Sequence, residues 1–259
     1  MRMRRLVLEH VALVTGASRG MGRAIALALA ADGVRVMAAA RDQEALDLLR
    51  SEGPGIEAVA VNLDGPDGCA RAIGATRRQL GPIAILVNNA GRGGWHDRPI
   101  WEQDRAGWSA SLAINLDAPF ELTRLAVPDM LAARWGRIVM ISSTAGEVGA
   151  PAQSPYCSSK HGVIGLMRSV AHDVAPFGVT CNAVLPGWVR TEMAERDAAR
   201  EASERGLDVE AVWAERAGTY PSGRVVEAEE IARVVGFLVS DGASGVNGEA
   251  ITVAHGSQW

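Results

Sequence analysis

The sequence predicts an α/β fold: a doubly wound, mostly parallel sheet of seven strands with helices on both faces and a small helical lid. Short apolar runs rich in β-branched residues alternate with helical stretches along the chain. Such alternation requires right-handed crossovers between parallel strands. A length of 259 residues with 48% hydrophobic side chains suits one compact domain. We therefore expect a single domain over residues 1–259.

The expected strands and helices follow one another in order. The strands are expected at residues 11–15, 34–40, 56–62, 83–88, 137–142, 179–185 and 250–253. The helices are expected at residues 21–31, 42–52, 67–80, 101–133, 156–177 and 227–240. Gly33 is typical of the end of the first helix, and Asp42 suits the N-cap of the second. Residues 190–220 are charged and alanine-rich, which predicts helices that form a substrate lid or, alternatively, a solvated surface pair.

Charge and cysteine usage exclude several classes of function. The net charge is -4 and no basic block occurs, which argues against binding to nucleic acid or an anionic membrane. The apolar run at residues 6–8 is too short for a signal peptide or a membrane span. Cys69, Cys157 and Cys181 are too widely spaced for a disulfide framework or a metal cluster. We expect a cytoplasmic protein with buried free cysteines and no metal.

A glycine-rich turn, Thr15-Gly-Ala-Ser-Arg-Gly-Met-Gly22, lies between the first strand and the first helix. A helix N-terminus at this edge of a parallel sheet offers free N–H groups to a pyrophosphate. Strand-to-helix turns also use glycine without any ligand, so the position of this turn carries the prediction. The residues expected to bind a dinucleotide here are Gly16, Ser18, Arg19, Gly20, Met21 and Gly22.

The end of the second strand indicates which dinucleotide is bound. A site for NAD usually has an acidic residue there, but this sequence reads Ala38-Ala39-Ala40-Arg41. The guanidinium groups of Arg41 and Arg19 match the geometry of a 2′-phosphate. Asp42 is the competing carboxylate. The sequence therefore favours NADP(H) over NAD(H).

Tyr156 and Lys160 are four residues apart near the start of a predicted helix, so their side chains share one face. They stand out because Lys160 is the single lysine beside 25 arginines, and Tyr156 is one of two tyrosines. An ammonium beside a phenol favours the phenolate and brings its pKa closer to neutral. Ser143 follows the fifth strand and could orient a carbonyl oxygen. These groups predict acid/base chemistry at a ketone.

The motifs together resemble the short-chain dehydrogenase/reductase family, in its single-domain Rossmann form, over essentially the whole chain. They are Thr15-Gly-x3-Gly-x-Gly22, Asn88-Asn-Ala-Gly91, Asn115, Ser143, Tyr156-x3-Lys160 and Pro186-Gly187. The resemblance implies that Tyr156 donates a proton to the carbonyl oxygen and that Ser143 hydrogen-bonds this oxygen. It also implies that Lys160 lowers the pKa of Tyr156 and holds the nicotinamide ribose, and that Asn115 holds a water of a proton relay.

The same resemblance implies further cofactor contacts. They are Asn62 and Leu63 at the adenine, Asn89, Ala90 and Gly91 at the adenosine and nicotinamide side, Val189 and Thr191 at the carboxamide, and the Pro186-Gly187 pair. Two positions depart from the family pattern. Asn62 stands where aspartate is common, and Ala254-His255-Gly256 replaces the usual ending. Neither departure affects the catalytic set.

Within the family, three segments resemble the 3-oxoacyl carrier-protein reductases and, more closely, the ketoreductases of aromatic polyketide synthesis. They are residues 88–94, 158–163 and 221–224. Trp95 and Trp188 each follow a strand end that carries a cofactor motif, so they are the expected substrate contacts, with His96 as a further candidate. Large aromatic residues also serve simply as core. The resemblance further implies a homotetramer and a small ketone substrate, either free or bound to a carrier protein.

Three functions remain open at this point. The first is an NADPH-dependent ketoreductase, which transfers a hydride to a β-ketoacyl or polyketide-like ketone. The second is an NAD(P)-dependent dehydrogenase that oxidises a secondary alcohol or hydroxy acid with the same residues. The third is a nucleotide-binding sensor or scaffold without turnover. The complete Ser143, Tyr156 and Lys160 set favours an enzyme.

Overall fold

The computed structural model describes residues 10–93 and 98–257, and all seven strands join one parallel sheet. The strand order is β3-β2-β1-β4-β5-β6-β7, so the predicted doubly wound fold is confirmed. The strands are β1 (Val11–Thr15), β2 (Arg35–Ala40), β3 (Ile56–Ala60), β4 (Ile85–Asn88), β5 (Gly136–Ile141), β6 (Val179–Pro186) and β7 (Ala250–Val253). Strands β1 to β3 are added in one direction across the sheet, and β4 to β7 are added in the other direction, so the strand order reverses between β1 and β4. Sheets of this kind bind ligands at that point.

Alternate residues of each central strand pack against opposite layers of helices. In β1, Ala12 and Val14 join the apolar core on one face, whereas Leu13 joins the core on the other face. All five residues of β1 are buried. Strands covered on both faces require continuous apolar runs, which explains the sequence pattern.

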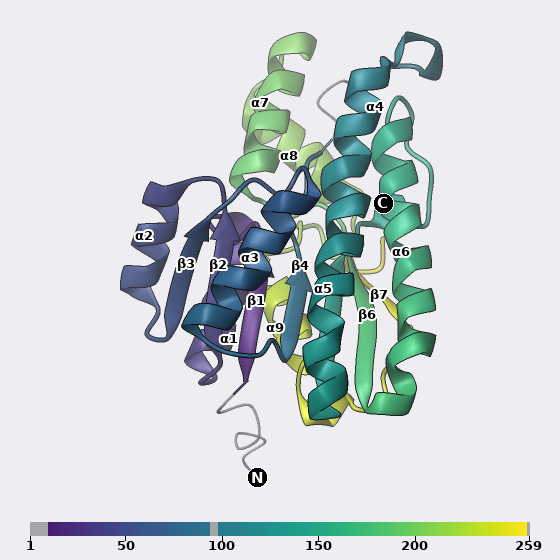
Figure 1. Ribbon diagram of the computed structural model, residues 1–259. Coiled ribbons are helices and arrows are strands. Elements are labelled where there is room, and N and C mark those ends of the chain that lie inside the picture. The colour runs from purple at the N-terminus through teal and green to yellow at the C-terminus, as the bar shows by residue number, and fades with distance from the viewer. Residues whose placement is uncertain (1–9, 94–97, 258–259) are drawn as a thin grey trace.

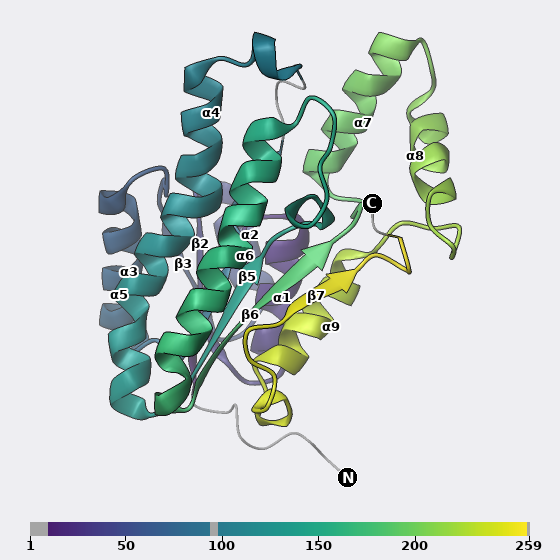
Figure 2. The ribbon, with the colours of Figure 1, turned by 90° about the vertical axis from the view of Figure 1, so that its right-hand side faces the viewer.

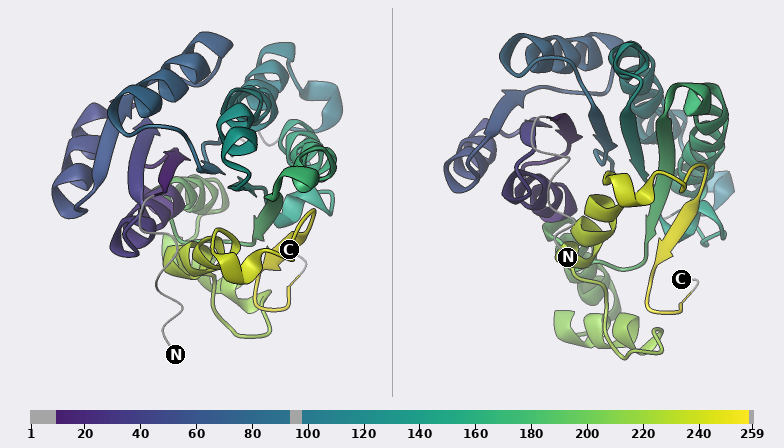
Figure 3. Two further views of the ribbon diagram at one scale, coloured as in Figure 1. Left: turned by 60° about the horizontal axis from the view of Figure 1, so that its bottom comes forward. Right: turned by 90° about the horizontal axis from the view of Figure 1, so that it is seen from below.

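Helices cover both faces of the sheet (Figures 1 and 3). The first layer contains α1 (Gly20–Ala31), α2 (Gln43–Glu52) and α9 (Ala228–Leu238). The second contains α3 (Pro66–Gln79), α5 (Ala118–Ala133) and α6 (Ser154–Val174). As predicted, the Asp42 side chain caps α2 by accepting a hydrogen bond from the N–H of Ala45. Cys69, Cys157 and Cys181 are buried and free, also as predicted.

The expected continuous helix over residues 101–133 is wrong in two places. A short 3-10 turn, Ile100–Glu102, precedes α4 (Arg105–Leu112), which begins after its N-cap Asp104. The chain then forms a π-helical turn, Ala113–Asp117, before α5. π-turns widen a helix locally and often occur at functional sites. This one contains Asn115.

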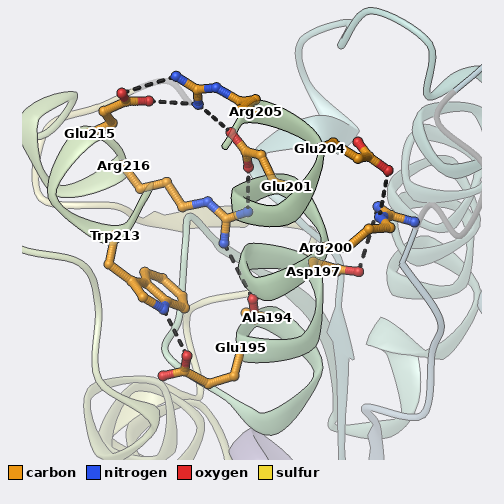
Figure 4. A network of polar contacts seen from close by, with 10 residues as sticks. All are labelled: Ala194, Glu195, Asp197, Arg200, Glu201, Glu204, Arg205, Trp213, Glu215 and Arg216. Carbon is orange, nitrogen blue, oxygen red and sulfur yellow. Dashed lines mark hydrogen bonds and ion pairs between the residues drawn. The ribbon is translucent and has the colours of Figure 1, made fainter. Parts of the chain in front are cut away.

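Residues 190–220 form two helices, α7 (Glu192–Arg205) and α8 (Val209–Gly218), as the sequence predicts. They project beyond the carboxyl ends of the strands (Figure 2). The pair has an apolar core of its own, formed by residues 194, 198, 202, 212, 213, 220, 225 and 254. The guanidinium of Arg216 on α8 joins the two helices, because it binds Glu201 of α7 at 2.9 Å (Figure 4). It also stacks 3.8 Å above the ring of Trp188, which follows β6. No helix of the described chain is both long and apolar enough to cross a membrane.

Candidate active site

A cavity of about 450 Å³ opens at the carboxyl ends of β1, β2 and β4, at the point where the strand order reverses. Its walls come from the glycine loop, the ends of β2 and β3, the loop after β4, and the start of α7. Thirteen of the residues predicted to bind a cofactor line it: Gly16, Ser18, Arg19, Gly20, Met21, Gly22, Arg41, Asn62, Leu63, Asn89, Ala90, Gly91 and Thr191. The sequence motifs therefore meet in one place.

The glycine loop delivers the N-terminus of α1 to this cavity. The N-cap residue Arg19 makes no side-chain capping bond, so its side chain leaves the first N–H groups of the helix free for a ligand. Gly16 has a φ of +65°, which a side chain would strain. A Cβ on Gly22 would lie 2.3 Å from the carbonyl oxygen of Gly16. These glycines allow the loop to turn tightly at the edge of the cavity.

Asn89 fixes the relative position of β1 and β4. Its amide nitrogen donates to the carbonyl oxygens of Thr15 at 2.8 Å and Gly16 at 3.2 Å. The Thr15 hydroxyl accepts from the N–H groups of Asn89 and Ala90 and donates to the carbonyl of Val87. The Asn88-Asn-Ala-Gly91 motif therefore holds the glycine loop in place as well as lining the cavity.

Arg41 stands exposed at the rim of the cavity, and within the described part of the chain its guanidinium has no ion-pair partner. Arg19 lies on the same cavity and approaches Glu192 at 3.6 Å. A guanidinium without a protein carboxylate is available to an anionic ligand. This arrangement fits a phosphate on the cofactor ribose.

Asn62 and Leu63 reach the cavity because α3 packs closely beneath them. A Cβ on Gly68 of α3 would lie 1.7 Å from the carbonyl oxygen of Asn62, a backbone atom that cannot rotate away. The thiol of Cys69 is 3.8 Å from the carbonyl oxygen of Leu63. The cavity wall at residues 62–63 therefore depends on glycine at position 68.

We expect Gly68→Ala to destabilise the fold by about 1–3 kcal/mol through this clash. Thermal or urea unfolding measures the change. Gly74→Ala is the matched control on the same helix, since its Cβ would meet only the flexible Arg78 side chain at 3.1 Å. Alanine is also the better helix former, so we expect this control to be neutral or stabilising. Equal effects of the two substitutions would contradict the packing argument.

Tyr156 and Lys160 lie in the first turns of α6, beside the ends of β5 and β6. The Lys160 ammonium donates to the carbonyl of Ile141 at 2.9 Å and lies 5.7 Å from the centre of the Tyr156 ring. The Ser143 side chain lies close enough to the Tyr156 hydroxyl to lower the pKa of that group. A Cβ on Gly91 would lie 3.6 Å from Lys160 Nζ, so this group adjoins the cavity wall.

The lowering of the Tyr156 pKa by Lys160 stays a prediction, because Lys160 is not among the groups that shift this pKa in the structure. Burial raises the pKa of Tyr156, and the Ser143 side chain only partly opposes this shift. Burial also lowers the pKa of Lys160 to about 8, because its ammonium is removed from water. The sequence could not show this result, since spacing places two groups together without giving their exposure.

Asn115 projects from the π-turn and joins three elements. Its amide nitrogen donates to the carbonyl of Arg92 at 3.1 Å and to the hydroxyl of Ser159 at 3.0 Å. Its oxygen accepts from the N–H of Arg92 at 2.9 Å. A Cβ on Gly91 would lie 3.0 Å from this oxygen, so Asn115 and Lys160 border the same glycine. Asn115 therefore fixes the loop after β4 to α6.

The remaining predicted residues lie outside the cavity lining. Pro186, Gly187 and Val189 follow β6, where a Cβ on Gly187 would lie 2.3 Å from the Tyr220 hydroxyl. Trp188 is half-buried beneath Arg216, so its contact with substrate stays a prediction. Trp95 and His96 lie outside the described residues. The described part of the chain holds no group of three or more His, Cys, Asp or Glu side chains that could bind a metal.

Several cavity residues carried no recognisable sequence signal. They are Val61, Asp64, Arg92, Ile114, Glu192, Met193 and Arg196. Arg92 follows directly on the Asn88-Asn-Ala-Gly91 motif, so proximity to that motif could have indicated it. Met193 and Arg196 reach the cavity only because α7 starts above it, which no spacing rule predicts.

The comparisons with known proteins agree with this geometry. A family model described as short chain dehydrogenase matches residues 10–202. The chain is 39% identical over 255 residues to granaticin polyketide synthase putative ketoacyl reductase 1 of Streptomyces violaceoruber, covering 96% of this chain and 93% of that protein. It is 36% identical over 253 residues to the 3-oxoacyl-[acyl-carrier-protein] reductase FabG of Escherichia coli, covering 95% and 96%.

A solved structure shares the whole fold. It is a crystal structure of a tryptophan variant of actinorhodin polyketide ketoreductase with NADPH, with a TM-score of 0.90 and 34% sequence identity. The match covers 96% of this chain and 97% of that chain. Together with the family model, the parallel sheet and the Ser143, Tyr156 and Lys160 site, these likenesses show that the chain belongs to the short-chain dehydrogenase family.

Proposed function

We propose that this protein is an NADPH-dependent ketoreductase that reduces a β-ketoacyl or polyketide-like ketone to a secondary alcohol. One observation carries the proposal: Lys160, whose ammonium lies 5.7 Å from the Tyr156 ring, adjoins through Gly91 a cavity that begins at an uncapped helix N-terminus. The ketoacyl reductase relatives and the NADPH-bound neighbour support it. The glycine loop, Arg19 and Arg41 would hold NADPH, whose nicotinamide supplies the hydride.

The chain's own residues would deliver the proton. The Tyr156 hydroxyl would be the donor to the ketone oxygen, and Ser143, which lies near Tyr156, would orient that oxygen. Lys160 has a pKa of about 8, so its proton exchanges near neutral pH and can restore the phenol after each turnover. Asn115 would position the path from Lys160 through its fixed contacts with Arg92 and Ser159.

The ketoacyl reductase relatives favour reduction over the alternative reaction. A proton donor must be protonated at working pH, and burial keeps the Tyr156 phenol in that form. Oxidation of a secondary alcohol would instead require the phenolate as a base. A sensor or scaffold without turnover has no need of the complete Ser143, Tyr156 and Lys160 set.

We expect the wild-type protein to prefer NADPH and Arg41→Ala to lose most of that preference. The exposed guanidinium of Arg41 would pair with the 2′-phosphate, and a charge-assisted pair contributes about 1.5–3 kcal/mol. The KM for NADPH should rise about tenfold or more while the KM for NADH changes little. Arg50→Ala, on the outer surface of α2, is the matched control. A wild-type preference for NADH would contradict the assignment.

A substrate panel tests the function itself. β-Ketoacyl thioesters, bicyclic ketones and aryl ketones should be assayed with NADPH, with its oxidation followed by absorbance. We expect turnover of at least one of the first two classes. If none of the three classes is reduced, the ketoreductase proposal fails.

We further propose a cytoplasmic homotetramer whose ketone substrate is free or bound to a carrier protein. Three buried free thiols suit a reducing compartment. Phe120 of α5 and Phe237 of α9 are each nearly half exposed, and large exposed apolar side chains suit contacts between copies of the chain. Light scattering after size exclusion tests the assembly.

A further inference from the structure

One carboxylate of α7 lies against the loop that follows β4. Asp197 is half-buried, and a Cβ on Gly93 would lie 3.6 Å from its Oδ2 atom. Gly93 belongs to the loop that follows β4 and Gly91. Figure 4 shows Asp197 on the side of α7 opposite to Trp213 and Arg216. Asp197 therefore lies against the β4 loop, on the side of α7 away from α8.

Two acidic side chains of α7 that face α8 already accept hydrogen bonds from residues of α8. Glu195 accepts from the Trp213 indole at 2.8 Å, and Glu201 accepts from Arg216 at 2.9 Å. Asp197 differs, because its ion pair is a long contact of 3.8 Å from Oδ1 to Arg200. Among the described residues, no hydrogen-bond donor satisfies its Oδ2 atom. A half-buried carboxylate oxygen with free acceptor capacity is suited to a ligand that brings a donor.

The field of Asp197 reaches the reacting hydroxyl. Its negative charge contributes to the raised pKa of Tyr156 on α6. Burial raises the pKa of Asp197 itself, and Arg200 and Arg196 on its own helix and Arg216 on α8 oppose this shift. A Cβ on Gly91, two residues before Gly93, would lie 3.6 Å from Lys160 Nζ, so Asp197 and the catalytic lysine adjoin the same short stretch of the β4 loop. A ketone held by Tyr156 would extend along this loop toward Asp197.

We propose that Asp197 is a specificity-determining residue that accepts a hydrogen bond from a hydroxyl group of the ketone substrate and repels substrates that carry a free carboxylate. The inference rests on the proposed ketoreductase function and narrows its substrate to hydroxylated ketones. A neutral hydroxyl satisfies the free oxygen, whereas a second carboxylate nearby would leave two like charges in a partly desolvated cleft.

The test compares matched substrates in the presence of NADPH. The pairs are 2-tetralone with hydroxylated 2-tetralones, and ethyl acetoacetate with acetoacetate. We expect the wild type to favour a hydroxylated tetralone by about tenfold in kcat/KM, and Asp197→Ala to abolish that ratio. Asp197→Asn should reduce the discrimination against acetoacetate. Glu204→Gln, which removes an exposed carboxylate that also pairs with Arg200, should leave both ratios unchanged.

A second measurement does not depend on turnover. Binding of the same tetralones to the full-length protein with NADP⁺ can be followed by tryptophan fluorescence, and the same tenfold preference is expected. Equal binding of the hydroxylated and parent ketones, or an equal change in Glu204→Gln, would overturn the role of Asp197. Failure of the proposed ketoreductase function would give a different result. In that case the wild type would reduce none of the ketones, whatever the ratio of their binding.

Discussion

Replacing Tyr156 with phenylalanine should reduce NADPH-linked ketone reduction by about 10²–10⁴-fold, the contribution of a positioned proton donor. The substitution removes one hydroxyl and keeps the ring, so the packing of α6 is retained. Ser143 can still hydrogen-bond the carbonyl oxygen, but its unperturbed hydroxyl is a far weaker acid than a phenol. Steady-state kinetics measure the loss in kcat, and NADPH binding, followed by fluorescence, should change by less than about tenfold.

The second tyrosine provides the matched control. The Tyr220 hydroxyl accepts a hydrogen bond from the N–H of Trp188 and packs against Gly187, so its role is to hold the turn after β6. Tyr220→Phe should lose about 1 kcal/mol of stability and keep most of the activity. Full activity in Tyr156→Phe, or an equal loss in both variants, would refute the assignment of Tyr156 as the proton donor.

The sequence predicted those parts of the fold that depend on local patterns. The apolar runs of the strands, the cap at Asp42 and the glycine loop all follow from spacing and residue type, and each lies where it was expected. The π-turn at Ala113–Asp117 was missed, because the sequence there has a helical pattern and the turn depends on contacts of Asn115 with Arg92 and Ser159.

The sequence predicted which residues form the site but not the pKa values of those residues. Motif order brings Tyr156 and Lys160 together, yet it does not show that burial dominates both pKa values. Asn89 was expected as a cofactor contact, and its bonds to Thr15 and Gly16 became visible only once the strands were adjacent. Contributions from α7, such as Asp197, depend on how a separate helix pair lies over the sheet. Tertiary contacts of this kind leave no local signal.

Replacing the single lysine with arginine should reduce kcat by about 10²-fold or more, although the charge is conserved. Lys160 is 5% exposed, and its compact ammonium donates to the carbonyl of Ile141 in a space bordered by Gly91. A planar guanidinium is larger and keeps its proton at every accessible pH, so it can neither fit this space nor exchange a proton near pH 8. Arginine, which outnumbers lysine 25 to one in this chain, therefore cannot replace lysine at position 160.

Lys160→Met separates this catalytic loss from misfolding. The pKa of Lys160 falls from an ordinary 10.5 to about 8 on folding. Between pH 8 and pH 10.5 the unfolded chain therefore binds more protons than the folded chain. The stability of the wild type should rise with pH across this range. Below pH 8 the full cost of burying the ammonium, about 3 kcal/mol, opposes folding. Lys160→Met removes that cost, so it should unfold at higher urea concentration at pH 7, lack the rise and be inactive. We infer that the buried ammonium is kept for catalysis although it costs stability. Activity of the Lys160→Arg variant would contradict this, and so would a Lys160→Met variant that is less stable than the wild type.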